Sequence, residues 1–196
     1  MEETNKYSFV KRVSNYKELY FYRKSLALYD ITYYFCEHYL LKGDRTIDQM
    51  VQAARSGKQN IIEGSEAAAT SCETEIKLLN VARASLKELQ ADYEDYLRVR
   101  ELAIWDAAHP RYEKMVEYCG RTNDAEGYVG LLAQLSDEEI ANLCLTLCHQ
   151  VDIMMVNYIA AKEKAFVEEG GIREGMTRAR LAYREGHPDK NYHRTT

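Results

Sequence analysis

Residues 49–89 read QMVQAARSGKQNIIEGSEAAATSCETEIKLLNVARASLKEL, and this stretch decides the fold of the chain. Its first half has small residues on one helical face, and its second half has large apolar residues at heptad-like spacing. A short polar segment joins the halves, so the stretch predicts an antiparallel helical hairpin that needs further helices to bury its seam. The small residues are Ala53, Ala54, Gly57 and Gly64, and the large ones are Ile76, Leu79, Leu86, Leu89 and Tyr93.

Two further long helices are expected around this hairpin. One covers about 16–41, where apolar residues recur every three or four positions. The other begins at Ser136, which with Glu139 has the pattern of a capping box, and ends at Gly170. The hairpin helices are expected at about 47–68 and 72–104. The expected seams are Leu19, Tyr22, Leu26, Tyr29, Tyr33, Cys36 and Leu40 in the first helix, and Ile140, Leu143, Leu147, Val151, Met154, Tyr158 and Ala161 in the last.

The sequence therefore predicts an all-α protein, an antiparallel up-down-up-down four-helix bundle over residues 16–170. A helical insertion at 105–135 precedes the last bundle helix, with short helices expected at about 110–119 and 125–134. Residues 1–15 read as a polar lead-in, and residues 171–196 as a basic C-terminal suffix with a short helix.

Composition limits the class of protein. The chain has 196 residues, enough for one domain with a real core, and only two prolines. Neither a signal peptide nor a membrane-spanning apolar run is expected. The five cysteines are an odd number and lack the spacing of a disulfide framework, which indicates a protein of the reducing cytoplasm. The net charge is −5, but residues 171–196 carry six Lys or Arg and three Asp or Glu, so an acidic body bears a basic tail.

The hairpin also resembles the signature of the small bacterial four-helix bundle proteins related to the protein of the 23S ribosomal RNA intervening sequence, the S23 family. The family pattern has two parts. The first contains a Gln, a pair of arginines, an Ala, a Ser and then Asn-Ile-Ala-Glu-Gly, and the second, later in the chain, is Ala-x-Gly-Ser-Leu-x-Glu-Leu. Here Val51 and Gln52 replace the arginines, and Ala84 replaces the later glycine. The matching residues are Gln49, Ala53, Ser56, Asn60, Ile61, Glu63, Gly64, Ala82, Ser85, Leu86, Glu88 and Leu89.

The resemblance implies a ring-like homo-oligomer, commonly a pentamer, and a branch of the family with a C-terminal suffix. One relative is the accessory protein of diversity-generating retroelements, a basic protein that binds a reverse transcriptase. This chain is acidic and lacks the paired arginines, so charge does not favour nucleic-acid binding except through the tail.

The signature residues have two interpretations. Asn60 and Glu63 are neighbours on one helical face, so they could form a polar site. Alternatively, Gly57 and Gly64 allow close helix packing, with Asn60 and Glu63 bonding across a helix or subunit interface, and this structural interpretation is the one favoured. It assigns a structural role to the signature residues Gln49, Ser56, Asn60, Glu63, Gly64, Ser85 and Glu88.

No catalytic constellation is expected. Cys144 and Cys148 share a helical face and could bind a metal ion, but no second ligand pair accompanies them and His149 points elsewhere. Core packing is the favoured role for both thiols. Ser85 lacks a histidine partner, so it reads as a packing residue. The sequence thus predicts no catalytic residue, no metal and no cofactor.

Two surfaces are candidates for partners. Seven tyrosines between Tyr16 and Tyr39 favour a protein interface over base stacking, because acidic residues balance the nearby cations. The tail arginines either line one side of a short helix and bind phosphate, or dock onto the acidic body of the same or a neighbouring subunit. The predicted function is a non-enzymatic homo-oligomeric scaffold or adaptor, and the alternative is a nucleic-acid-binding accessory protein acting through the tail. The tail arginines are Arg173, Arg178, Arg180 and Arg184.

Overall fold

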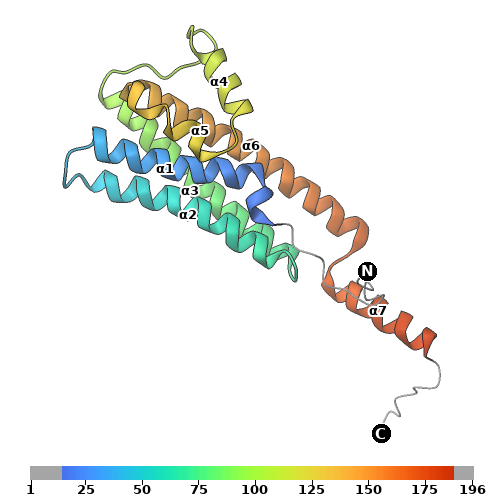
Figure 1. Ribbon diagram of the computed structural model, residues 1–196. Coiled ribbons are helices and arrows are strands. Elements are labelled where there is room, and N and C mark those ends of the chain that lie inside the picture. The colour runs from blue at the N-terminus through green and yellow to red at the C-terminus, as the bar shows by residue number, and fades with distance from the viewer. Residues whose placement is uncertain (1–14, 188–196) are drawn as a thin grey trace.

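Four helices, α1, α2, α3 and α6, pack together as a helical bundle in the computed structural model, which describes residues 15–187 (Figure 1). Within that range the protein is all-α, without strands. The lead-in residues 1–14 and the end of the suffix, 188–196, lie outside the described residues. The elements are η1 Tyr16–Glu18, α1 Tyr20–Tyr39, α2 Arg45–Ala67, α3 Cys72–Val99, α4 Tyr112–Arg121, α5 Ala125–Val129, η2 Leu132–Gln134, α6 Asp137–Glu169 and α7 Ile172–Gly186.

Neighbouring bundle helices run in opposite directions. In α3 and α6, Arg83 bonds to Asp152 at 2.7 Å, whereas the later Tyr96 bonds to the earlier Asp137 at 2.9 Å. In α1 and α6, Phe21 packs its ring against that of Tyr158, and Tyr39, at the other end of α1, donates a hydrogen bond to the Leu135 carbonyl just before α6. Contacts therefore pair the start of one helix with the end of the next.

Several helix starts and ends lie where the sequence predicts them. Asp44 caps α2 by accepting a hydrogen bond from the Thr46 amide, and Ser71 caps α3. At the start of α6 the capping box of Ser136 and Glu139 is complete, which satisfies two otherwise free amides. The bundle helices are thus delimited by local side-chain chemistry.

The buried face of α1 differs from the expected seam. Phe21 and Phe35, which the prediction left off the seam, are buried, whereas Tyr33 is 56% exposed. The reason is that α1 contacts α2, α5 and α6 rather than one partner, so its buried face is wider and turned. In α6, similarly, Met155 is buried, while Ala161 is exposed because it lies near the end of the bundle.

Helix α3 ends at Val99, five residues before the predicted end. Glu101 adopts a left-handed conformation with φ 58°. The Leu102 amide bonds to the Leu97 carbonyl at 2.9 Å and the Glu101 amide to the Arg98 carbonyl at 3.2 Å, which is a Schellman motif. Glycine usually occupies this left-handed position. Because Glu101 occupies it here, the sequence carried no glycine signal for the end of α3, and the helix was predicted to continue.

Beyond the bundle, α6 continues as an arm, which we define as residues 163–186. The arm consists of the last turns of α6, the joint Gly170–Gly171 and α7, and it extends away from the other helices (Figure 1). No residue after Ile159 is buried among those described. Exposed apolar side chains on the arm are Phe166, Val167, Met176 and Leu181, with 49%, 82%, 43% and 52% of their surface accessible.

One described helical segment, Asp137–Gly186, is long and apolar enough to cross a membrane by length and composition alone. The sequence analysis expected none, because no apolar run approaches the roughly 20 residues needed to span a bilayer. A core helix of a globular protein meets the same criterion, and Ile140, Leu147 and Val151 of α6 are fully buried in the bundle. Core packing thus accounts for the 39% of that apolar window that is buried in the bundle.

Candidate functional site

The seam between α2 and α3 is built on two glycines. A Cβ at Gly57 would lie 2.7 Å from Cδ2 of Leu86, and one at Gly64 would lie 3.3 Å from the carbonyl oxygen of Glu75. The helices therefore approach closely enough at both positions that a larger residue would displace the opposite helix or its core side chains. This is the close packing that the small-residue face predicts.

A small polar cluster lies beside these glycines. The Ser56 and Ser85 hydroxyls are 2.9 Å apart, which joins α2 to α3. The Asn60 amide donates to the Ser56 carbonyl at 2.9 Å and to its hydroxyl at 3.3 Å, and both bonds lie within α2. Glu63 is exposed and contributes nothing to the cluster. The structure thus brings together three of the signature residues and leaves Glu63 apart.

Towards the start of α2 the seam opens into a hollow of about 240 Å³, the α2–α3 hollow, lined by Gln49, Ala53, Glu88 and Asp92. Gln49 and Glu88 are signature residues, and the sequence analysis missed Asp92, which lies one helical turn after Glu88. Burial, and then the charges of Asp95 and Glu88, raise the pKa of the Asp92 carboxyl. Within residues 15–187, no cation forms an ion pair with Glu88 or Asp92. Among the described residues, the hollow is therefore an acidic surface without a paired cation.

The four tail arginines divide into two groups on α7. Successive helical residues are rotated by about 100°, so Arg173, Arg180 and Arg184 share one flank while Arg178 lies on the other side. Arg178 donates a hydrogen bond of 2.8 Å to the Glu169 carbonyl across the joint. The expectation that all four line one side is therefore wrong, because their spacing of five, two and four residues does not follow one face.

The cysteines are core residues. Cys144 and Cys148 are buried in α6, Cys36 and Cys119 are buried elsewhere, and Cys72 is half-buried. Burial raises the pKa of the Cys36, Cys119 and Cys148 thiols to about 12, which disfavours the reactive and metal-binding thiolate. His149 is exposed. Among the residues described, no three His, Cys, Asp or Glu side chains form a group that could hold a metal ion.

A lysine is buried under the insertion. Lys24 of α1 is fully buried, and its ammonium group donates to the Cys119 carbonyl and, at 2.9 Å, to the Thr122 carbonyl at the end of α4. Burial lowers the pKa of this amine. The Tyr128 hydroxyl donates to the same Thr122 carbonyl at 2.6 Å. Lys24 thus joins α1 to the C-terminal end of α4, where a cation is favoured by the helix dipole.

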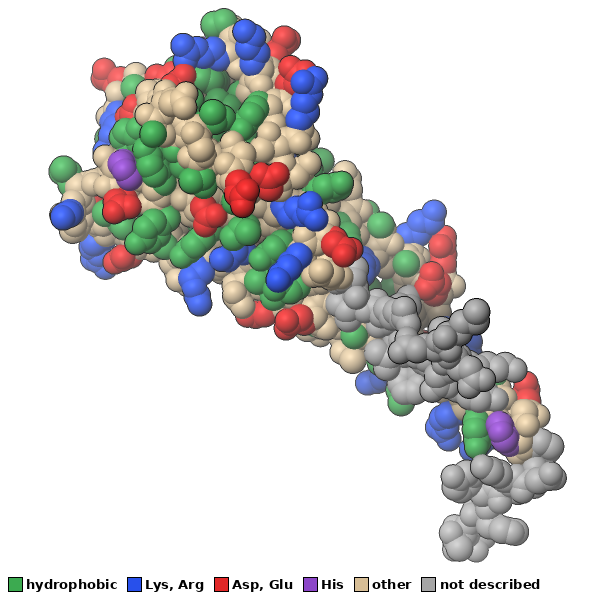
Figure 2. All heavy atoms as spheres, viewed as in Figure 1, with side chains coloured by type: hydrophobic (Ala, Val, Ile, Leu, Met, Phe, Trp, Pro, Cys, Tyr) green, Lys and Arg blue, Asp and Glu red, His purple; other side chains and the backbone are tan. Residues whose placement is uncertain are grey.

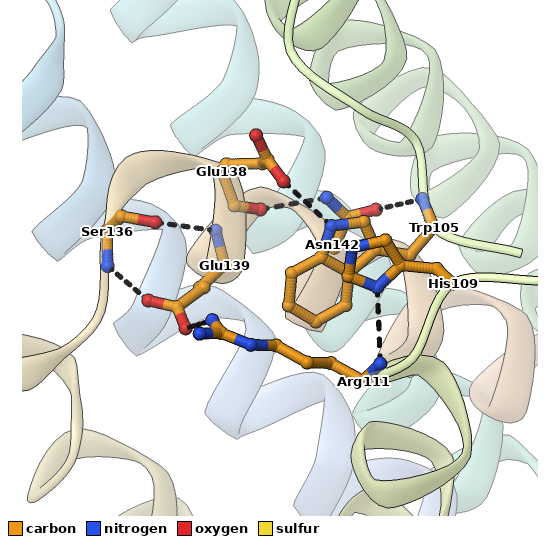
Figure 3. A network of polar contacts seen from close by, with 7 residues as sticks. All are labelled: Trp105, His109, Arg111, Ser136, Glu138, Glu139 and Asn142. Atoms are coloured by element: carbon orange, nitrogen blue, oxygen red, sulfur yellow. Dashed lines mark hydrogen bonds and ion pairs between the residues drawn. The ribbon is translucent and has the colours of Figure 1, made fainter.

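A polar network fastens the beginning of the insertion to α6 (Figure 3). The buried Asn142 side chain accepts from the Trp105 amide at 2.8 Å and donates to the Ala103 and Glu138 carbonyls at 2.9 Å each. The Trp105 indole donates to Glu138 at 2.8 Å and stacks on the His109 ring. The network joins the segment before α4 to the first turns of α6.

A buried carboxylate lies at the end of the bundle away from the insertion. Glu75 is 1% exposed, and it accepts a hydrogen bond of 2.7 Å from the Tyr158 hydroxyl and an ion pair of 3.0 Å from Lys162. Its two partners compensate the cost of burying its charge. This contact joins the start of α3 to α6 where α6 leaves the bundle.

Sequence reasoning missed Lys24, Glu75 and Asn142. Their signal was weak, since each is a polar residue within an amphipathic helix and a solvated position was the natural interpretation. Lys24 follows Phe21 by three residues and precedes Leu28 by four, so its place on an apolar face was the one available indication.

Comparison of the chain with models of protein families, with curated proteins and with solved structures finds no match in any of the three. What the protein does must therefore be inferred from its own residues and their geometry.

Proposed function

We propose that this chain is a non-enzymatic homo-oligomeric scaffold or adaptor of bacterial cytoplasm, built as an up-down-up-down four-helix bundle of the S23 type. The resemblance of the α2–α3 hairpin to that family supports the type of bundle. The proposal assigns no catalytic residue and no cofactor to the protein.

The arm is the observation that carries the proposal. Its helix α7 has 15 residues and none of them is buried, although isolated helices of about that length are marginal in water. Phe166, Val167, Met176 and Leu181 leave apolar surface uncovered along the arm. Figure 2 shows hydrophobic side chains at the surface over the bundle and along this arm. A second copy of the chain supplies the surface that would cover them.

The test is the solution mass of the full chain, measured by light scattering. We expect a defined multiple of the chain mass of 22.7 kDa, with a pentamer as the multiple that the family resemblance implies. A mass of one chain across the measured concentration range would overturn the proposal.

A nucleic-acid-binding accessory role is the second candidate. It is favoured by Arg173, Arg180 and Arg184, which form no ion pair within the described part of the chain. It predicts salt-dependent binding of RNA or DNA by the full chain that is lost when residues 171–196 are deleted. An absence of such binding at low salt would remove this candidate.

A further inference from the structure

The α2–α3 hollow and the arginine flank of α7 are two charged surfaces that form no ion pair within the part of the chain that the structure describes. In the hollow, Glu88 is exposed, Asp92 is half-buried, and their mutual repulsion contributes to the raised pKa of Asp92. On α7, Arg180 and Arg184 are exposed. Such opposite patches gain attraction and lose repulsion when they meet.

The spacing of the two charge pairs matches. Glu88 and Asp92 are four residues apart on α3, and Arg180 and Arg184 are four residues apart on α7. Residues at this spacing lie about 5–6 Å apart on a helix surface, so two helices lying side by side can form both ion pairs at once. Met176, 43% exposed, precedes Arg180 by one turn on the same face and adds an apolar contact.

The hollow and α7 lie at opposite ends of one chain. Tyr96, one turn after Asp92, bonds to Asp137 at the first residue of α6, whereas α7 follows the last residue of that 33-residue helix. The distance along α6 is about 50 Å. From there α7 continues away from the bundle (Figure 1). The α7 of a chain therefore does not approach its own hollow.

We propose that α7 of one copy docks on the α2–α3 hollow of a second copy, with Arg180 and Arg184 pairing with Glu88 and Asp92. The inference rests on the proposed homo-oligomer and names its interface. The two surfaces differ, so the contact is head-to-tail, and each copy uses its α7 on one neighbour and its hollow on another. Gln49 lines the same hollow and offers an amide to the docked helix.

Charge reversal in the full chain tests this interface by light scattering, with circular dichroism to check that each variant folds. We expect Arg180→Glu with Arg184→Glu to reduce the mass to 22.7 kDa, and Glu88→Lys with Asp92→Lys to do the same. Combining all four substitutions restores opposite charges across the contact, and the oligomer mass should return.

Exposed residues of α4 supply matched controls. Glu113→Lys with Glu117→Lys changes the net charge as the hollow variant does, and Lys114→Glu with Arg121→Glu changes it as the α7 variant does. Both controls should keep the wild-type mass, which separates a specific contact from an effect of net charge.

The outcomes distinguish this inference from the function on which it rests. A wild-type monomer overturns both. A wild-type oligomer whose mass survives both reversals overturns the interface and leaves the oligomeric scaffold standing. If reversal at Arg180 and Arg184 abolishes salt-dependent RNA binding without changing the mass, the flank is a nucleic-acid surface and the docking proposal is wrong.

Discussion

Gly57 and Gly120 are both helical glycines, but their surroundings differ. A methyl group at Gly57 would lie 2.7 Å from Leu86, whereas nothing lies within 4 Å of the corresponding point at Gly120. Alanine gains about 1 kcal/mol over glycine inside a helix, and overpacking a core costs about 1–3 kcal/mol. We expect Gly57→Ala to lower the free energy of unfolding by up to about 2 kcal/mol and Gly120→Ala to raise it by up to about 1 kcal/mol. Urea denaturation measures both, and a gain at Gly57 would show that the seam has spare room.

Glu101 holds a left-handed conformation that glycine adopts without strain. We expect Glu101→Gly to raise the free energy of unfolding by about 1 kcal/mol, since the Schellman motif remains and the strain is removed. Glu101→Ala keeps a Cβ while removing the carboxylate, so it separates the backbone effect from the charge. Equal stabilisation by both substitutions would attribute the gain to charge alone.

Lys24 should give the protein a pH dependence of its own. Burial lowers the pKa of its amine in the folded state, so the unfolded state binds more protons between the folded and unfolded pKa values. Its contribution to stability therefore rises as pH increases through that window towards the ordinary lysine pKa. We expect the stability of wild type relative to Lys24→Met to increase between neutral and alkaline pH in denaturant titrations. A constant difference would mean that the lysine is not desolvated.

At the level of elements, Asn142 connects the segment before α4 to α6 through two hydrogen bonds, with the Trp105 amide and the Ala103 carbonyl, and makes a third to Glu138 within α6. We expect Asn142→Ala to lower the free energy of unfolding by about 2–3 kcal/mol, because it leaves buried backbone groups unpaired. Trp105 is the only tryptophan, so its fluorescence should shift to longer wavelength as the loop becomes exposed to water. Asn157→Ala, an exposed asparagine on the same helix, is the control and should change stability by less than about 0.5 kcal/mol.

The elements that the sequence predicts best are those whose ends depend on neighbouring residues. Ser136 and Glu139 predict the start of α6, and the small residues around Gly57 predict the close contact between α2 and α3. The buried face of α1 was harder to predict because three partners distant in the sequence determine it. The end of α3 was missed because its turn uses Glu101 where glycine is usual.

The candidate surfaces show the same division between local and distant causes. The grouping of Ser56, Asn60 and Ser85 follows from helix periodicity and antiparallel pairing, which a sequence can reveal. Asp92 became part of the hollow only through the register between α2 and α3, which sets Gln49 against it. Arg178 lies apart from the other arginines because its spacing along α7 places it on another face, which helix periodicity alone can reveal.

At the scale of the whole molecule, folding and assembly should be linked through concentration. A partner that binds only the folded state raises the unfolding temperature as its concentration increases. We expect the melting temperature of the full chain to rise with protein concentration and that of a chain ending at Glu169 to be independent of it. The shortened chain should otherwise unfold as cooperatively as the full one, because α7 buries no residue in the bundle. A concentration dependence that survives truncation would place the assembly contact in the bundle itself.

The joint between α6 and α7 carries a geometric consequence. Gly170 has φ 77°, the Glu174 carboxylate accepts from the Gly171 amide at 3.0 Å, and Arg178 reaches back to Glu169, so the turn has one braced angle. In a head-to-tail assembly the same angle between α6 and α7 recurs at every copy, so each copy is rotated by the same amount relative to the one before it. The curvature of the assembly, and hence the number of copies at which it closes or its pitch if it stays open, is then encoded in two glycines.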